Sequence, residues 1–561
     1  MSHPLTHPRT QRRLRPALVG TTAVALAVVL GPAVAEAADV QLGPLTKVSD
    51  GDPFAACKAD NVAKQEKAGS VLYPNTEIEP WIAANPANPK NVLASWQQDR
   101  WSDGGSRGGV AGVSNNGGSS WKSVIPGRVT KCEGGPWTRA SDFWADFSTK
   151  GVAYFMHLAI EPDLPNGQFG ASAMVVTRST DGGQTWGKPV TLIKDPNGQS
   201  LNDKNSITAD PKDPDLAYAV WDRLTDFTLP PVEGGEPVVG GLDAATHKAI
   251  GMDGVELARA WHEFFKDRGE GEKAPTQVFF KGPTYFARTT DAGKTWEKAR
   301  KIYDPGPNEQ TLGNQIVVRP DGTLVDFFAH FLPTGVDRLE LIRSKDKGKT
   351  WSKPTVATVM VTLGSVTPDK QEPIRDAANL FDVAVDPQNG NLYAVLQEYR
   401  YHGVEEVSFL MSTDGGDSWT TPARINQTPA PGKNPLLRQA IIPSVEVGPD
   451  GVLVVTYYDF RNDNNTGELA DYWAVFCDPK KTNCGVAKNW GGEVRLTTKS
   501  FDYLNAPVAR GHFLGDYVGL ERAGDAVLPA FGIADGKNKT SIYTRRITFG
   551  GKADVASALG Q

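Results

Sequence analysis

Acidic residues recur at one point of a repeated strand pattern, the start of a β-rich segment. Glu79 begins EPWIAANP, Asp142 begins DFWADFS, Asp203 begins DKNSITADP and Asp516 begins DYVGLER. Two carboxyl groups beside a glycosidic bond can break it, one as an acid and the other as a base or nucleophile. Glu79, Asp142 and Asp203 are therefore candidate catalytic residues, and Asp516 is a candidate substrate-binding residue.

Arginine recurs at a second point, the end of the strand that follows. The four positions are Arg100 in SWQQDRW, Arg223 in VWDRL, Arg400 in LQEYRYH and Arg461 in TYYDFR. Arginine binds a carboxylate through two parallel hydrogen bonds. Four arginines near the candidate acids would therefore suit the carboxylate of an acidic sugar.

The same residues also allow a structural interpretation. Each acid could bond a neighbouring strand, and each arginine could pair with a nearby acid, because ion-pair networks are common in folded proteins. Tyr458, three residues before Arg461 in TYYDFR, is a candidate nucleophile. A buried tyrosine with a bonded hydroxyl is the commoner case.

Five octapeptides with the same pattern of residue types recur along the chain, between the β-rich segments that carry the acids and arginines. The copies are SNNGGSSW from Ser114, STDGGQTW from Ser179, TTDAGKTW from Thr289, SKDKGKTW from Ser344 and STDGGDSW from Ser412. A β-rich run precedes and follows each copy, which predicts a hairpin turn. The third-position acid or Asn accepts backbone hydrogen bonds, glycine supplies positive φ, and the tryptophan buries an apolar face.

Seven segments with this strand pattern predict an all-β propeller of four-stranded blades. They begin near Glu79, Asp142, Asp203, Asn314, Asn379, Ile442 and Asp516. The last segment lacks an obvious fourth strand, which Val40–Val48 could supply to close the ring. A six-bladed ring with one extra unit is the alternative.

The direction of the strands decides which residues share a face. Consecutive strands of a blade alternate in direction, so the turn between the third and fourth strands lies opposite the start of the first strand. The octapeptides are therefore expected on one face. The acids and arginines are expected together on the other.

The N-terminus has the features of a secretion signal, with arginines before the apolar run Ala17–Leu30 and small residues after it. This run is too short to span a bilayer, and we expect no membrane span. Cleavage would change the net charge from −6 to about −9, which disfavours nucleic acid as a partner.

The predicted domains are a signal peptide over residues 1–37, an N-terminal segment over 38–76, the propeller over 77–548 and a tail over 549–561. The third blade holds an insertion over residues 225–280. Its apolar residues Leu257, Trp261, Phe264 and Phe265 have helical spacing.

The chain has four cysteines, an even number that in an exported protein predicts two disulfides rather than a metal site. Cys477 with Cys484 would close a short loop, and Cys57 with Cys132 would hold the N-terminal segment. No cofactor is expected. Structural calcium stays open, although no D-x-D-x-D-G loop is present.

The five octapeptides resemble the Asp box, or BNR repeat, of secreted sialidases and other β-propellers. The resemblance implies a glycoside hydrolase that releases terminal sialic acid, or a related acidic sugar, from extracellular glycans. The competing class is a non-catalytic extracellular propeller that binds glycan or protein through the same face, because one fold serves many functions.

Overall fold

The computed structural model describes residues 40–163, 168–196, 200–228, 278–464 and 467–550. These residues all belong to one compact unit, Ala37–Gln561. The expected signal peptide and the expected helix of the insertion lie outside the described residues. The described part is all-β, built of antiparallel sheets, as the sequence predicts.

The first three four-stranded units run along the chain in order. The first has β2 (Leu72–Ala84), β3 (Val92–Trp101), β4 (Ser106–Ser114) and β5 (Lys122–Val124). The second has β6 (Arg139–Phe147), β7 (Ala153–Asp163), β8 (Gln168–Ser179) and β9 (Val190–Asp195). The third has β10 (Ser200–Ala209), β11 (Ala217–Thr228), β13 (Thr284–Thr289) and β14 (Arg300–Tyr303), with β12 (Val278–Lys281) paired to β11.

Three more units follow. The fourth has β15 (Gln310–Val318), β16 (Leu324–Phe331), β17 (Arg338–Ser344) and β18 (Thr355–Val359). The fifth has β20 (Phe381–Val385), β21 (Leu392–Glu398), β22 (Glu406–Ser412) and β23 (Ala423–Arg424). The sixth has β24 (Ala440–Val447), β25 (Leu453–Asp459), β26 (Leu469–Cys477) and β27 (Gly491–Arg495), with β28 (Phe501–Asp502) paired to β26.

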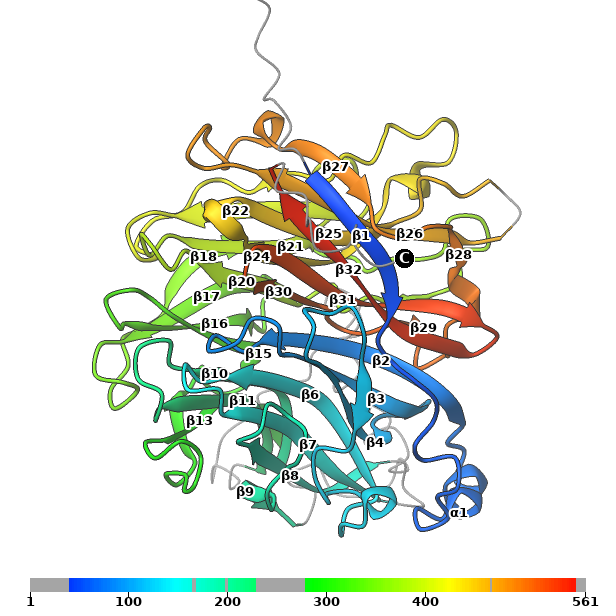
Figure 1. The fold of residues 1–561 in the computed structure, drawn as a ribbon, viewed down its shortest axis with the longest axis vertical. Coiled ribbons are helices and arrows are strands. Elements are labelled where there is room, and N and C mark those ends of the chain that lie inside the picture. The colour runs from blue at the N-terminus through cyan, green and yellow to red at the C-terminus, as the bar shows by residue number, and fades with distance from the viewer. Residues whose placement is uncertain (1–39, 164–167, 197–199, 229–277, 465–466, 551–561) are drawn as a thin grey trace, which may run out of the picture. The chain divides into compact units, whose positions relative to one another are not determined.

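The seventh unit takes its fourth strand from the other end of the chain. It has β30 (Gly519–Ala523), β31 (Ala526–Gly536), β32 (Lys539–Phe549) and β1 (Val40–Lys47). β1 pairs with β32 in antiparallel fashion, and Figure 1 shows blue β1 beside red β32. The N-terminal strand therefore joins the last strands of the chain in one sheet.

Short elements lie between these units, except that the 3₁₀ turns Pro449–Gly451 and Ala487–Asn489 lie within the sixth unit. They are the helix α1 (Val62–Lys67), the parallel pair β19 (Ile374–Arg375) and β29 (His512–Phe513), and the 3₁₀ turns η1 (Lys131–Glu133), η2 (Pro435–Arg438), η3 (Pro449–Gly451), η4 (Ala487–Asn489) and η5 (Tyr503–Asn505). No helix of the described residues is long and apolar enough to cross a membrane.

The first strands of the seven units contact one another in cyclic order. β2 contacts β6, and the series continues through β10, β15, β20 and β24 to β30, which contacts β2 again. Residues with the same place in each unit are therefore neighbours around a common axis.

Two disulfides confirm the expectation from the cysteine count. Cys57 is bonded to Cys132, and Cys477 is bonded to Cys484. The first joins the segment after β1 to η1, and the second closes a short loop between β26 and β27.

The octapeptides lie between the third and fourth strands of the first five units and share one set of bonds. In the second copy, the Asp181 carboxylate accepts the backbone N–H of Thr185 at 2.9 Å, and the Ser179 hydroxyl accepts the N–H of Gly183 at 3.0 Å. Corresponding bonds recur in the other four copies. These side chains are occupied in holding the turn.

The glycine at the fifth position of each copy packs against the preceding unit. Gly183 has a φ of 89°, and a Cβ there would lie 2.4 Å from Cδ2 of Leu93, a fully buried residue of β3. Gly293 similarly packs against Tyr154 on β7. The octapeptide therefore requires glycine for its conformation and for the contact between units.

Gly183→Ala should lower the free energy of unfolding by about 1–3 kcal/mol more than Gly134→Ala, because the methyl group overpacks the interface with Leu93. Gly134 is a matched control: its φ is 85°, and a Cβ there would meet nothing within 4 Å. Urea unfolding of both variants measures the difference. Equal losses would mean that the contact between units contributes nothing.

Candidate functional site

A β-bulge interrupts the first strand of three successive units at corresponding places. The pairing register shifts between Ile78 and Trp81 in β2, between Ser141 and Trp144 in β6, and between Asp203 and Ser206 in β10. The residues within these bulges, Glu79, Asp142 and Lys204, have φ values of 52°, 53° and 43°. Because β2, β6 and β10 are neighbours, the bulges bring these three side chains together.

The Lys204 ammonium lies at the centre of the resulting cluster. It pairs with the Asp516 carboxylate, and its Nζ is 3.8 Å from Oδ1 of Asp142 and 3.9 Å from Oε1 of Glu79. The Asp516 backbone N–H also donates to Oε1 of Glu79 at 3.2 Å. One cation therefore contacts acids from three units.

Arg375 supplies the second cation. Its Nε donates to Oδ1 of Asp516 at 2.8 Å, and its Nη2 donates to Oδ2 at 2.6 Å. The guanidinium lies 4.2 Å from the centre of the Phe513 ring, and that of Arg100 lies 5.1 Å from it. The two arginines thus contact one ring on β29.

The acids around Lys204 differ in proton affinity. Burial, together with the charge of Asp516, raises the pKa of Glu79 well above its usual value. Burial alone would raise the pKa of Asp516, but Arg375 and Lys204 outweigh it and hold that pKa well below its usual range. Glu79 therefore favours the protonated form and Asp516 the ionised form.

Asp203, which directly precedes Lys204, is the most accessible acid of the group. It is half-buried, whereas Asp142 is 2 % exposed. Burial and the negative charge of Asp142 raise the pKa of Asp203 to about 7, and the two carboxyl groups share a hydrogen bond. A carboxyl group with such a pKa can give or take a proton near neutral pH.

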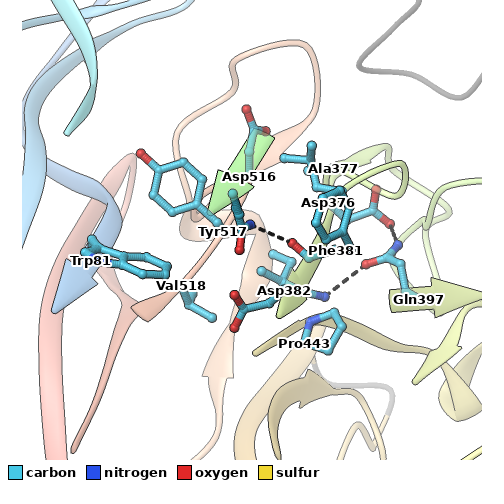
Figure 2. A pocket seen from close by; sticks show the side chains of 13 residues that line it. Trp81, Asp376, Ala377, Phe381, Asp382, Gln397, Pro443, Asp516, Tyr517 and Val518 are labelled. Carbon is cyan, nitrogen blue, oxygen red and sulfur yellow. Dashed lines mark hydrogen bonds between the residues drawn. The ribbon is translucent and has the colours of Figure 1, made fainter. Parts of the chain in front are cut away.

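Aromatic side chains lie directly below the cluster. Trp81 and Trp144 stack with ring centres 3.5 Å apart, and Tyr517 meets the Trp144 ring at 5.4 Å. Trp81 and Tyr517 lie on one side of a small pocket that also contains Asp516, with Gln397 on the opposite side (Figure 2). A cavity of about 510 Å³ between the first strands begins at the two tryptophans.

The candidate arginines Arg223, Arg400 and Arg461 do not share a carboxylate partner among the described residues. Arg223 binds Asp195 at 2.6 Å, whereas the other two pair within their own units, Arg400 with Glu398 and Arg461 with Asp459 and Glu493. The fourth, Arg100, donates to Oε1 of Gln97 at 2.7 Å. Three of the four are thus neutralised by nearby acids, as the structural interpretation expects.

The structure places Tyr458, the candidate nucleophile, in the core rather than in the cluster. The side chain is fully buried in the apolar cluster between the sixth and seventh units, and its hydroxyl donates to the Gly532 carbonyl at 2.9 Å. Burial raises its pKa well above the usual value. Tyr458 is a core residue with a bonded hydroxyl.

Sequence reasoning missed the two cations of the site. Lys204 follows Asp203 directly, and the β-bulge between Asp203 and Ser206 turns it toward the axis. No residue type in this segment predicts that bulge. Arg375 lies in the connection between the fourth and fifth units, outside the repeated pattern.

Within the described ranges, one group of side chains has the spacing of metal ligands, and it lies outside the cluster. It consists of Cys57, Asp60 and Cys132, whose two sulfur atoms are bonded to each other. These thiols are not available as thiolate ligands.

No family model and no curated protein matches this chain. Solved structures similar to this chain include sialidases and an arabinanase. They include a Hadza microbial sialidase (16 % identity, 82 % of this chain and 76 % of that chain, TM-score 0.39) and the intramolecular trans-sialidase from Ruminococcus gnavus (14 %, 73 % and 94 %, 0.39). An α-L-arabinanase from Penicillium chrysogenum is similar at 12 % identity (79 % and 100 %, 0.42).

These similarities concern the fold alone.

Asp203→Asn should remove a pH dependence of stability. A carboxyl group whose pKa is about 7 in the folded protein and ordinarily 3.8 stabilises the fold fully below pH 3.8, and this stabilisation is lost as pH rises through 7. The free energy of unfolding of the variant should therefore fall less between pH 4 and 8 than that of the wild type. Parallel curves in urea unfolding would show that Asp203 has an ordinary pKa.

Proposed function

We propose that this protein is a secreted glycoside hydrolase that acts on extracellular glycans, built as a seven-bladed β-propeller. The cyclic contacts of seven first strands support the blade count. The two disulfides are compatible with an extracellular protein.

One observation carries the proposal: carboxyl groups of unlike proton affinity surround a single ammonium. Pairs of acids whose pKa values are driven apart are typical of acid–base catalysis. Asp203 has a pKa of about 7 and is half-buried, so it can reach a substrate. Buried structural ion pairs have no need of such an accessible proton.

Each acid then has a role. Asp203 is the general acid that protonates the leaving oxygen, and Asp142 shares its hydrogen bond and holds the proton there. Glu79, the second carboxyl group, favours the protonated form and must lose its proton to solvent before it acts as base or nucleophile. Glu79 and Asp142 both lie within 4 Å of Nζ of Lys204, so their nearest oxygens are less than about 8 Å apart.

The substrate hypothesis from the sequence is terminal sialic acid or a related acidic sugar. Its support came from arginines, and three of those four bind acids of this chain. Neutral sugars are therefore equal candidates for the substrate.

A non-catalytic extracellular propeller that binds glycan or protein is the second candidate. The observation in its favour is that Lys204, Arg375 and Asp516 satisfy one another and are each less than 10 % exposed in their side chains. Such a cluster can serve to hold the units together.

Asp203→Asn and Asp142→Asn should each lower kcat/KM by about 10²–10⁴-fold, because proton transfer to the leaving group is lost. Fluorogenic glycosides of sialic acid and of neutral sugars measure this. Wild-type activity should also fall as pH rises through about 7, where Asp203 loses its proton.

Asp326→Asn is the matched control, since Asp326 is a buried acid of β16 with a raised pKa, outside the cluster. It should keep wild-type turnover. Absence of turnover on every glycoside between pH 4 and 8, together with binding on a glycan array, would favour the second candidate.

A further inference from the structure

The connection between the fourth and fifth units, residues 361–379, leaves the sheets and reaches the residues between the sixth and seventh units. Its β19 pairs in parallel with β29, Ile374 beside His512 and Arg375 beside Phe513. The His512 backbone N–H donates to the Pro373 carbonyl at 2.9 Å. A segment remote in sequence from Asp516 thereby brings Arg375 to it.

Three buried side chains fix the course of this connection. Glu405 accepts the backbone N–H groups of Leu363 and Gly364, the latter at 2.9 Å. Gln439 both accepts from the Val366 N–H, at 3.2 Å, and donates to its carbonyl, at 2.8 Å.

Glu468 is the third, and it is fully buried. Its carboxylate accepts the backbone N–H groups of Asp369 at 3.0 Å and Lys370 at 2.7 Å. Side chains of the fifth and sixth units therefore hold the segment that carries Arg375.

We infer that Arg375 is a positioning residue for the proposed reaction: its two bonds to Asp516 hold that carboxylate, and so keep Lys204 between Asp142 and Glu79. The inference rests on the proposed function. Both bonds of Arg375 go to Asp516, which pairs with Lys204, so Arg375 acts through Asp516 and Lys204.

The charge balance of the cluster explains why Arg375 affects the acids that it does not bind. The groups that face the cluster are Glu79 on β2, Arg100 on β3, Asp142 on β6, Asp203 and Lys204 on β10, Asp222 on β11, Arg375 on β19, and Asp516 and Tyr517 before β30. Acids outnumber cations among them. Removing one buried cation therefore raises the pKa of the remaining acids, and one of them takes up a proton.

The geometry of Arg375 matters as well as its charge. A guanidinium binds both oxygens of a carboxylate in one plane, whereas an ammonium is a point charge. Arg375→Lys should thus keep the proton balance but leave Asp516 free to turn. Arg375→Met should lose both.

The test measures the pKa of Asp203 in three backgrounds, without reference to activity. The difference in unfolding free energy between each protein and its Asp203→Asn derivative, followed against pH, reports that pKa. Arg375→Met should raise it by about 1 or more, and Arg375→Lys should leave it near 7. Arg288→Met is the matched control, because the Arg288 side chain is also 9 % exposed and pairs with Glu297 in the third unit; it should change nothing.

Activity supplies the second measurement. With a glycoside that the wild type hydrolyses, Arg375→Met should move the alkaline limb of the pH profile upward and lower kcat with little change in KM. In Arg375→Lys the alkaline limb of the pH profile should stay at its wild-type position, and kcat should lie between those of the wild type and Arg375→Met. An unmoved pKa and an unmoved limb in Arg375→Met would overturn the inference.

Two outcomes separate the inference from the proposed function. If no glycoside is hydrolysed but the pKa of Asp203 rises in Arg375→Met, the proposed function fails and Arg375 still sets the proton balance of the cluster. If Arg375→Met does not fold, Glu468→Gln replaces it. That variant keeps the cluster and loosens the segment bearing Arg375, so it should lower kcat, and full wild-type kcat would contradict the inference.

Discussion

The structure depends on one electrostatic constraint, the burial of the Lys204 ammonium between strands of different units. Removing a charge from water is costly unless it is paired and hydrogen-bonded. Lys204 meets that condition only when β2, β6 and the residues before β30 are all in place. Arg375 adds its charge from a fourth direction. The cluster can therefore form only when the first and last units are neighbours.

At the ends of the sheets that carry the octapeptides, the units are held together by packing rather than by charge. Each octapeptide closes its turn with its own side chains and sets a glycine against the unit before it. β1 completes the last sheet from the far end of the chain. Contacts between units thus have two kinds of origin, apolar near the octapeptides and ionic near the acids, which leaves the ionic end free to carry chemistry.

Much of this could be predicted from the sequence, because repeated strand patterns place equivalent residues at equivalent points. Glu79, Asp142, Asp203 and Asp516 begin their segments and do gather. The arginines pair with acids near their own strand ends, Arg461 with Asp459 of its own unit and Arg223 with Asp195 of the preceding unit, so they do not gather around one position. Tyr458 failed because strand alternation directs it into the core. The position of Lys204 depends on a β-bulge, and that of Arg375 on a connection between units. Neither feature produces a periodic pattern in the sequence, so neither residue could be predicted.

The central claim is that Glu79, Asp203 and Asp516 hold their protons unequally around Lys204. Neutron diffraction from crystals grown near pH 6 would test it most directly, because deuterium positions show which carboxyl groups are protonated. The account predicts deuterium on Asp203 and Glu79 and none on Asp516, with Lys204 fully charged. Four ionised carboxylates around the ammonium, or a protonated Asp516, would contradict it.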